Sequence, residues 1–211
     1  MVAPRSRARD DTAMQKLVYV YADESCLGIQ YTDRDSPGGA AGLVEYWTGN
    51  VWVRRDFWIS EPATTNNRMA IRSGITALTL LRGPCRVIFT SDSQYLIRGM
   101  GEWIHGWVRR GWRRKSGAVE NEDLWRQLAE AARSHRIDWR WVRGHAGHAQ
   151  NEYANYLAVR AAREQSDSAG LTESGFAGWI EAERRERGNF VDFDECAPPP
   201  GEKFDPAPDV P

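Results

Sequence analysis

Two aspartates stand at the ends of two stretches that are typical of buried β-strands. Asp23 ends the run in "YVYADES", and Asp92 ends the run in "RVIFTSDSQY". The β-branched and aromatic residues before each aspartate favour strands. Two carboxylates brought together at the ends of core strands repel each other and raise each other's pKa. A divalent cation with oxygen ligands, most often magnesium, relieves that repulsion. The pattern therefore predicts a metal-dependent phosphoryl-transfer protein.

The spacing of apolar residues predicts an alternation of strands and helices. Strands are expected at 16–22, 38–47, 51–59, 85–91 and 137–142, and helices at 63–81, from 92, within 102–115, at 121–135 and at 149–164. Three strands, a helix, a strand, helices, a strand and a helix make an α/β or α+β architecture, in which helices cover a mixed sheet.

The two ends of the chain differ in composition from the middle. Residues 1–15 are polar and rich in Arg and Asp, which predicts a disordered extension. Residues 16–165 form the predicted folded domain. Residues 166–211 form a C-terminal extension, with a possible helix at 174–188 and an acidic, Pro-rich tail at 196–211 that we expect to be disordered.

Charge and cysteine content limit the possible partners. The net charge is −1, so nucleic-acid binding must come from a local patch. Such a patch lies between residues 98 and 115, where six cations face Glu102 alone. The three cysteines predict neither a disulfide framework nor a zinc site. Without an apolar signal segment or a membrane-length apolar run, we expect a cytoplasmic monomer that has no membrane partner.

Eight short segments between Leu17 and Arg163 occur in an order that is specific to one family. They are "DESCLG", "PGGAAGLVE", "TTNNRM", "TSDSQYL", "WIHGWVRRGWRR", "NEDLW", "WVRGHAGH" and "NEYANYLA". Together they resemble type 1 ribonucleases H, which hydrolyse the RNA strand of RNA–DNA hybrids. The resemblance implies an α/β, ribonuclease H-like fold with a mixed five-stranded sheet flanked by helices. It also implies Mg²⁺ (or Mn²⁺) as cofactor and an RNA–DNA hybrid as partner.

The resemblance implies four carboxylates around two metal ions, and two of those positions are not acidic here. Asp23 and Asp92 match the first and third carboxylates. Ala70 stands at the second position and Asn155 at the fourth, and the glycine usual after the first aspartate is Glu24. Asn155 can still offer a carbonyl oxygen, whereas Ala70 offers no ligand. The resemblance therefore implies a metal site weakened by the loss of two charges.

Two other acids could supply the missing charge. Glu152 lies three residues before Asn155, on nearly the same helical face, and is the preferred substitute. Glu24 ranks second, because regular pleating directs it away from Asp23 unless a bulge re-aims it. For either one, a solvated surface acid is the alternative.

The resemblance also implies roles for residues outside the metal site. His145 would assist proton transfer or product release, whereas His148 is expected only to cap the last helix. Asn66, Asn67 and Gln94 would contact the minor groove of the hybrid, with simple N-capping as the alternative for the asparagines. Cys26 would lie against the DNA strand or be a small buried thiol. Phosphate contacts are expected from the basic segment: Arg109, Arg110, Arg113, Arg114 and Lys115.

Two functions follow from these expectations. The first is a metal-dependent endonuclease of ribonuclease H type, with Asp23, Asp92, Asn155 and His145 as catalytic residues. The second is an inactive module that retains the groove for the hybrid but lacks the chemistry. A third and weaker possibility is an interaction protein that recruits a partner through its tail and last helix.

Overall fold

The computed structural model describes residues 15–28, 36–114, 117–201 and 203–210. Most of the predicted N-terminal extension, residues 1–14, lies outside the described residues. The strands are β1 (Leu17–Cys26), β2 (Ser36–Trp47), β3 (Trp52–Thr64), β4 (Arg86–Ser91), β5 (Arg113–Arg114), β6 (Gly117–Ala118), β7 (Arg136–Trp141) and β8 (Thr172–Glu173). The helices are α1 (Asn66–Thr79), α2 (Gln94–Arg98), the π-helical turn Gly99–Trp103, α3 (Ile104–Arg109), α4 (Glu122–Ala132), α5 (Ala149–Glu164) and α6 (Phe176–Arg187).

The main sheet is mixed, and it has six strands in the order β7-β4-β1-β2-β3-β8. β1, β2 and β3 are antiparallel neighbours, whereas β4 is parallel to both β1 and β7. The predicted mixed sheet is confirmed, but the predicted number of five strands is wrong. The sixth strand, β8, has two residues and comes from the C-terminal extension, where no alternating pattern marked it.

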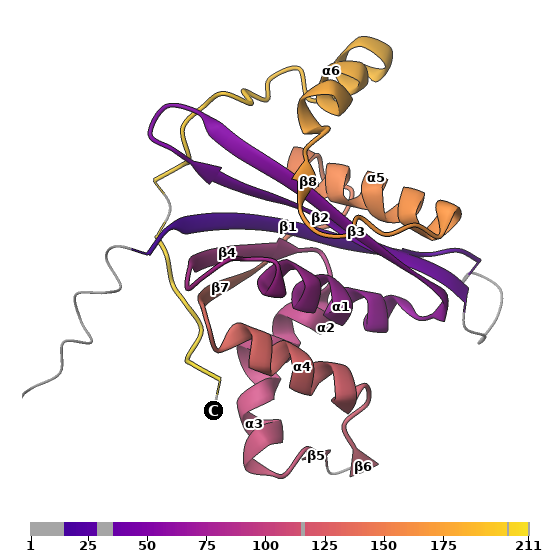
Figure 1. The fold of residues 1–211 in the computed structure, drawn as a ribbon, viewed down its shortest axis with the longest axis vertical. Coiled ribbons are helices and arrows are strands. Elements are labelled where there is room, and N and C mark those ends of the chain that lie inside the picture. The colour runs from indigo at the N-terminus through magenta and orange to yellow at the C-terminus, as the bar shows by residue number, and fades with distance from the viewer. Residues whose placement is uncertain (1–14, 29–35, 115–116, 202, 211) are drawn as a thin grey trace, which may run out of the picture.

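Helices cover both faces of the sheet (Figure 1). The strand residues Val18, Val20 and Ala22 point to the face that holds α1, α2 and α4, and they join the larger apolar cluster there. Ala41 and Leu43 point to the opposite face and pack with α5 in a second cluster. The period-2 alternation of the strands therefore assigns each side chain of β1 to one helical layer.

The C-terminal extension is part of this folded unit. Phe176 and Ile180 of α6 are fully buried in the second apolar cluster. None of the described helices is long and apolar enough to cross a bilayer.

The acidic, Pro-rich tail packs against the body, so the expectation that it is disordered is wrong for residues 196–201 and 203–210. Trp52 Nε1 donates to the Ala197 carbonyl at 2.8 Å, and the Ala207 amide donates to the Ile137 carbonyl at 2.9 Å. Figure 1 shows the tail running from α6 past the β2–β3 hairpin to the side of β7. Hydrogen bonds that join the backbone of the tail to Trp52 of β3 and to Ile137 of β7 hold this segment, and amino-acid composition does not reveal such bonds.

Candidate active site

Asp23 and Asp92 come together because β1 and β4 are parallel and in register. Ala22 pairs with Ser91, and β4 ends there, so the next residue of each strand is an aspartate at the same edge. Carboxylate oxygens of Asp23, Glu24 and Asp92 all lie within 4.8 Å of one another. The predicted convergence of Asp23 and Asp92 is confirmed, and a third carboxylate joins them.

Glu24 reaches this group without a bulge. The pairing of β1 with β2 is regular through Asp23 and Glu24, so pleating directs Glu24 toward the α1 face, as it does Ala22. Because β4 has already ended, no strand separates the two faces of β1 at this point. The longer glutamate side chain can therefore bring its carboxylate to the aspartates. The expectation that Glu24 needs a bulge is wrong.

The three carboxylates are electrostatically frustrated. Burial, followed by repulsion from Asp92, raises the pKa of Asp23 to about 8. Burial and the two aspartates hold the pKa of Glu24 well above its usual range, although a hydrogen bond from Ser93 opposes this. Burial also raises the pKa of Asp92. In addition, Glu24 Oε2 is buried without a hydrogen-bond partner among the described residues. A hard divalent cation fits this set of oxygen donors.

Asn151 holds Asp23 from the other side and is a functional candidate that sequence reasoning missed. It lies in the first turn of α5, is 3% exposed, and donates from Nδ2 to Asp23 Oδ2 at 3.1 Å. The other carboxylate oxygen of Asp23 accepts from the Glu24 amide at 2.7 Å. Asn151 Oδ1 is buried without a partner among the described residues. The only available signal was its place one turn before Asn155.

Glu152 is bonded to His145, and among the described residues it does not belong to the group of three carboxylates. Glu152 Oε2 lies 3.3 Å from His145 Nδ1. Glu24, and not Glu152, is the acid that the structure places within 4.8 Å of Asp23 and Asp92, whereas the ranking of the two as metal ligands stays a prediction. Helical spacing alone did not show which partner the Glu152 carboxylate meets. His145 is 77% exposed in its side chain and adopts a positive φ of 53°.

His148 stands at the N-cap of α5 but makes no side-chain capping bond. Its ring packs on Tyr21 with the centroids 5.6 Å apart, and burial lowers its pKa. His148 therefore occupies the expected N-cap position, but its side chain packs against Tyr21 and makes no capping bond.

The loop before α5 crosses very close to Asp92. A Cβ atom added to Gly144 would lie 2.3 Å from Asp92 Oδ2, so any larger residue there would have to displace the Asp92 carboxylate. Trp141 Nε1 donates to the Asp92 carbonyl at 2.9 Å. The sequence did not single out Gly144 or Trp141 for this site, because each contacts Asp92, which is about 50 residues away along the chain.

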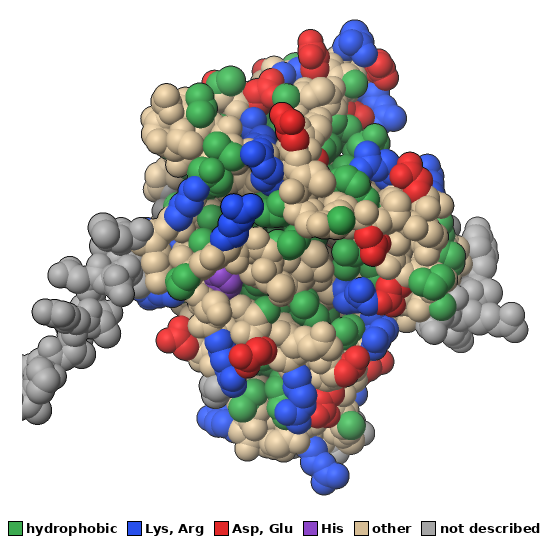
Figure 2. Space-filling view, viewed as in Figure 1, with side chains coloured by type: hydrophobic (Ala, Val, Ile, Leu, Met, Phe, Trp, Pro, Cys, Tyr) green, Lys and Arg blue, Asp and Glu red, His purple; other side chains and the backbone are tan. Residues whose placement is uncertain are grey.

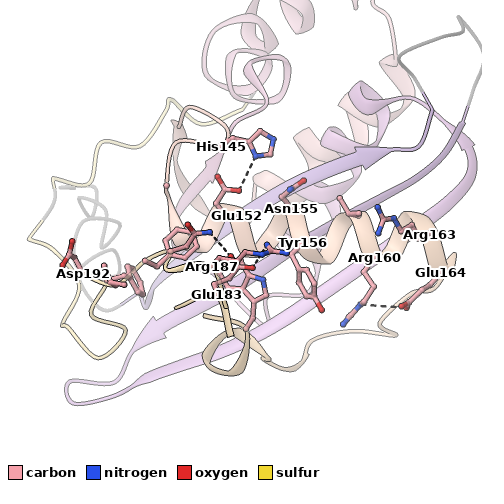
Figure 3. A pocket seen from close by; sticks show the side chains of 17 residues that line it. His145, Glu152, Asn155, Tyr156, Arg160, Arg163, Glu164, Glu183, Arg187 and Asp192 are labelled. Carbon is pink, nitrogen blue, oxygen red and sulfur yellow. Dashed lines mark hydrogen bonds and ion pairs between the residues drawn. The ribbon is translucent and has the colours of Figure 1, made fainter. Parts of the chain in front are cut away.

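Asn155 lines a groove that runs along α5 (Figure 3). Glu152 of the same groove is the neighbour along α5 of Asn151, the donor to Asp23. The groove has a volume of about 950 Å³ and also borders His145 and Glu152. Asn155 and Asn151 are one helical turn apart, so both face the same end of the sheet. The first turns of α5 thus lie beside Asp23 on the face of the sheet opposite α1.

The predicted substrate-contacting residues of α1 and α2 lie at helix N-termini. Asn66 and Asn67 are exposed, and the N-cap is Thr65, whose hydroxyl accepts from the Arg68 amide. Simple N-capping by the asparagines is therefore wrong. Gln94 is exposed at the start of α2, which Ser93 caps. Cys26 is partly buried at the end of β1.

The basic segment forms a separate projection. Arg109, Arg110, Arg113 and Arg114 are all exposed around α3 and β5, whereas Trp107 and Trp112 are each 7% exposed and pack inward. Lys115 lies outside the described residues. Figure 1 shows this projection at the end of the molecule opposite α6, and Figure 2 shows basic and acidic side chains interspersed there.

Ala70 is fully buried in the larger apolar cluster, on the α1 face to which Glu24 is directed. Its methyl group contributes packing and no ligand. The acid at this edge thus comes from β1 and not from α1.

Comparison with known proteins agrees with this arrangement. Residues 15–163 match the family described as RNase H. The chain is 47% identical to "Ribonuclease H" of Shewanella sp. (strain MR-4) over 152 residues, 72% of this chain and 90% of that one. It is also 47% identical to "Ribonuclease H" of Halorhodospira halophila over 148 residues, 70% of this chain and 93% of that one.

Solved structures extend the likeness to the C-terminal region. A crystal structure described as "LC9-RNase H1, a type 1 RNase H with the type 2 active-site motif" is 48% identical, with a TM-score of 0.81 over 93% of this chain and 94% of that one. The solution structure of the PFV RNase H domain shares the fold alone, at 18% identity and a TM-score of 0.59 over 71% of this chain and 96% of that one. The chain belongs to the RNase H family.

Proposed function

We propose that this protein is a metal-dependent endonuclease that hydrolyses the RNA strand of RNA–DNA hybrids, acting as a cytoplasmic monomer. The observation that carries the proposal is the group of three carboxylates at the end of β1 and β4, all within 4.8 Å. Family membership supports the substrate. The similar LC9-RNase H1, described as a type 1 RNase H with the type 2 active-site motif, supports an altered set of acids in an enzyme of this type.

Asp23, Glu24 and Asp92 would hold Mg²⁺ or Mn²⁺, with the Asn155 carbonyl as a neutral fourth ligand. Bound divalent ions supply an activated water and stabilise the leaving oxygen. Glu24 supplies the carboxylate that Ala70 cannot, so the site keeps three negative charges and not two. This favours the active enzyme over the inactive hybrid-binding module.

The chain's own groups would prepare the reaction in three ways. Asn151 orients Asp23, the close approach of Gly144 confines Asp92, and Glu152 holds the exposed His145 near the site, where it can move a proton. Asn66, Asn67, Gln94 and Cys26 would contact the hybrid. Arg109, Arg110, Arg113, Arg114 and Lys115 would contact its phosphates.

A cleavage assay tests this function. The full chain is incubated with a hybrid that carries a fluorescent RNA strand, first with Mg²⁺ and then with Mn²⁺. We expect RNA cleavage with either ion, no cleavage in EDTA, and a loss of about 100-fold or more in Asp92→Asn. Tight binding of the hybrid without cleavage, unchanged by Asp92→Asn, would instead establish the inactive module.

Stability of the metal-free protein should fall as pH rises from about 4 to about 8. The pKa of Asp23 is about 8 in the folded state and 3.8 ordinarily, so over this interval the folded state retains a proton that the unfolded state releases. Thermal unfolding in EDTA at pH 5 and pH 8 measures the loss. Mn²⁺ should raise Tm more at pH 8, because ligands bind metal when ionised. Asp23→Asn should reduce the difference and leave the part that comes from Glu24 and Asp92, whose pKa values burial also raises. Equal pH dependence in both proteins would contradict the prediction.

Asn151→Leu tests whether this amide positions Asp23. Leucine has a similar size, but it leaves the buried Asp23 Oδ2 without its donor, so we expect a loss of about 1 to 3 kcal/mol in the free energy of unfolding. Asp23 would lose its orienting donor, and we expect kcat to fall about 10-fold or more, with weaker Mn²⁺ binding in calorimetry.

Ser73→Ala is the control for Asn151→Leu, because Ser73 is also fully buried and its hydroxyl only donates to the Ala70 carbonyl. Unchanged kcat and unchanged Mn²⁺ affinity in Asn151→Leu would show that the amide has no positioning role.

A further inference from the structure

The groove that Glu152 and Asn155 line continues along α5 to residues of the C-terminal extension (Figure 3). Its near end is formed by His145 and Asn155, and its far wall by Trp179 and Phe190. The far wall lies beyond residue 163, where the family match ends. A strand of nucleic acid that passes the proposed catalytic centre therefore meets a surface that the extension completes.

Tyr156 gives the groove a supported aromatic surface. It is 46% exposed although it is a large apolar side chain. Its ring stacks on Tyr153 at an interplanar angle of 21° and also lies near Trp179. Rigid, half-exposed aromatic rings stack unpaired bases. Bases inside a duplex are already stacked on both sides, so this surface suits single-stranded and not duplex nucleic acid.

The charges of the groove are suited to one phosphate. Arg160 lies 4.0 Å from Glu164, and Arg187 lies 2.7 Å from Glu183, so those two arginines are paired. Arg163 is exposed, and it has no ion pair among the described residues. It lies eight residues after Asn155, about 12 Å along the helix. Because acids are also present, the contribution from charge should be small, and base stacking should contribute most of the affinity.

We propose that this groove binds single-stranded RNA that continues from the hybrid past the cleavage site, with one base stacked on Tyr156 and one phosphate bound by Arg163. The occupant is RNA because the strand at the proposed catalytic centre is RNA. This inference rests on the proposed function and adds a substrate class to it: hybrids with an unpaired RNA extension.

Binding of four substrates with one common duplex tests the proposal. One hybrid is blunt, one has a 5′ and one a 3′ single-stranded RNA extension, and one has an unpaired extension on the DNA strand. Fluorescence anisotropy is measured on the full chain in an Asp92→Asn background, which allows binding without cleavage. We expect one of the two RNA extensions to tighten binding about 5- to 10-fold over the blunt hybrid.

The variants should change only the affinity that the single-stranded RNA extension adds to the hybrid. Tyr156→Ala should remove most of the gain, Tyr156→Phe should retain it, and Arg163→Ala should reduce the salt slope for the extended hybrid by about 0.7. Arg82→Ala is the matched control, because Arg82 is an exposed arginine that lies three residues after the end of α1. None of these variants should change the affinity for the blunt hybrid.

Three results would overturn the proposal, and they differ in what else they imply. Equal affinity for blunt and extended hybrids, with the blunt hybrid cleaved normally by the unmodified chain, would reject the groove and leave the proposed function intact. Failure to bind any hybrid would reject both. A dimer in size-exclusion chromatography that Tyr156→Ala dissociates would assign the groove to a second copy of the chain.

Discussion

Glu24→Gln should lower the single-turnover rate of hybrid cleavage by about 100-fold or more. The substitution is isosteric, but it removes one of three negative charges from a site where the oxygens lie within 4.8 Å. Glutamine can still accept the hydrogen bond from Ser93, so the backbone of β1 should not move. Hybrid affinity in the absence of cleavage should change little, and the Mn²⁺ concentration needed for half-maximal activity should rise.

The matched control for Glu24→Gln is Glu152→Gln. Glu152 is also a glutamate near Asp23 and Asp92, but its carboxylate is bonded to His145 at 3.3 Å. It should lose less than about 10-fold in rate, with the change appearing in the pH profile and not in the metal requirement. A larger loss in Glu152→Gln than in Glu24→Gln would restore Glu152 as the substitute ligand and reject the role of Glu24.

Moving the carboxylate from residue 24 to residue 70 tests whether the two positions serve one metal site. Ala70 lies on the α1 face toward which Glu24 is directed. Adding Ala70→Glu to the inactive Glu24→Gln chain should therefore recover part of the cleavage, because the charge enters the same edge of the sheet from the helix. No recovery, in a variant that melts normally, would mean that the two positions do not serve one site.

Sequence alone predicted the parts of the site that depend on strand order. Asp23 and Asp92 follow two buried strands, and parallel neighbours end at one edge, so their convergence could be inferred. The position of the Glu24 carboxylate could not be inferred, because it depends on β4 ending at Ser91, before the level of Glu24 on β1. Sequence patterns do not resolve the end of a strand to a single residue. The roles of Asn151 and Gly144 depend on contacts between distant segments.

The C-terminal region shows a different limit. Its Pro-rich, acidic composition is typical of disorder, yet Asp205 donates its amide to Asp138, and Arg140 donates to the Lys203 carbonyl. Composition reports how much apolar surface a segment carries. It does not report that a neighbouring strand edge offers partners for the backbone of that segment.

Asp56→Ala should cost about 3 to 5 kcal/mol in the free energy of unfolding. Asp56 is 3% exposed and accepts from the Tyr153 hydroxyl at 2.6 Å, the Ser174 hydroxyl at 2.6 Å and the Gly175 amide at 3.0 Å. Alanine would leave three donors without their acceptor. Burial raises the pKa of Asp56, and these three donors oppose that rise. Denaturant unfolding measures the loss.

Asp167→Ala is the control for Asp56→Ala, because Asp167 also joins the extension to β3, accepting from the amide and hydroxyl of Ser60, but it is exposed. It should cost less than about 1 kcal/mol. Tyr153 lies in α5 between Asn151 and Asn155, so Asp56→Ala should also reduce cleavage at temperatures where the chain remains folded. Equal losses of stability in the two variants would show that Asp56 is not the junction between the extension and the site. Unchanged cleavage in a destabilised Asp56→Ala would show that α5 keeps its place without this junction.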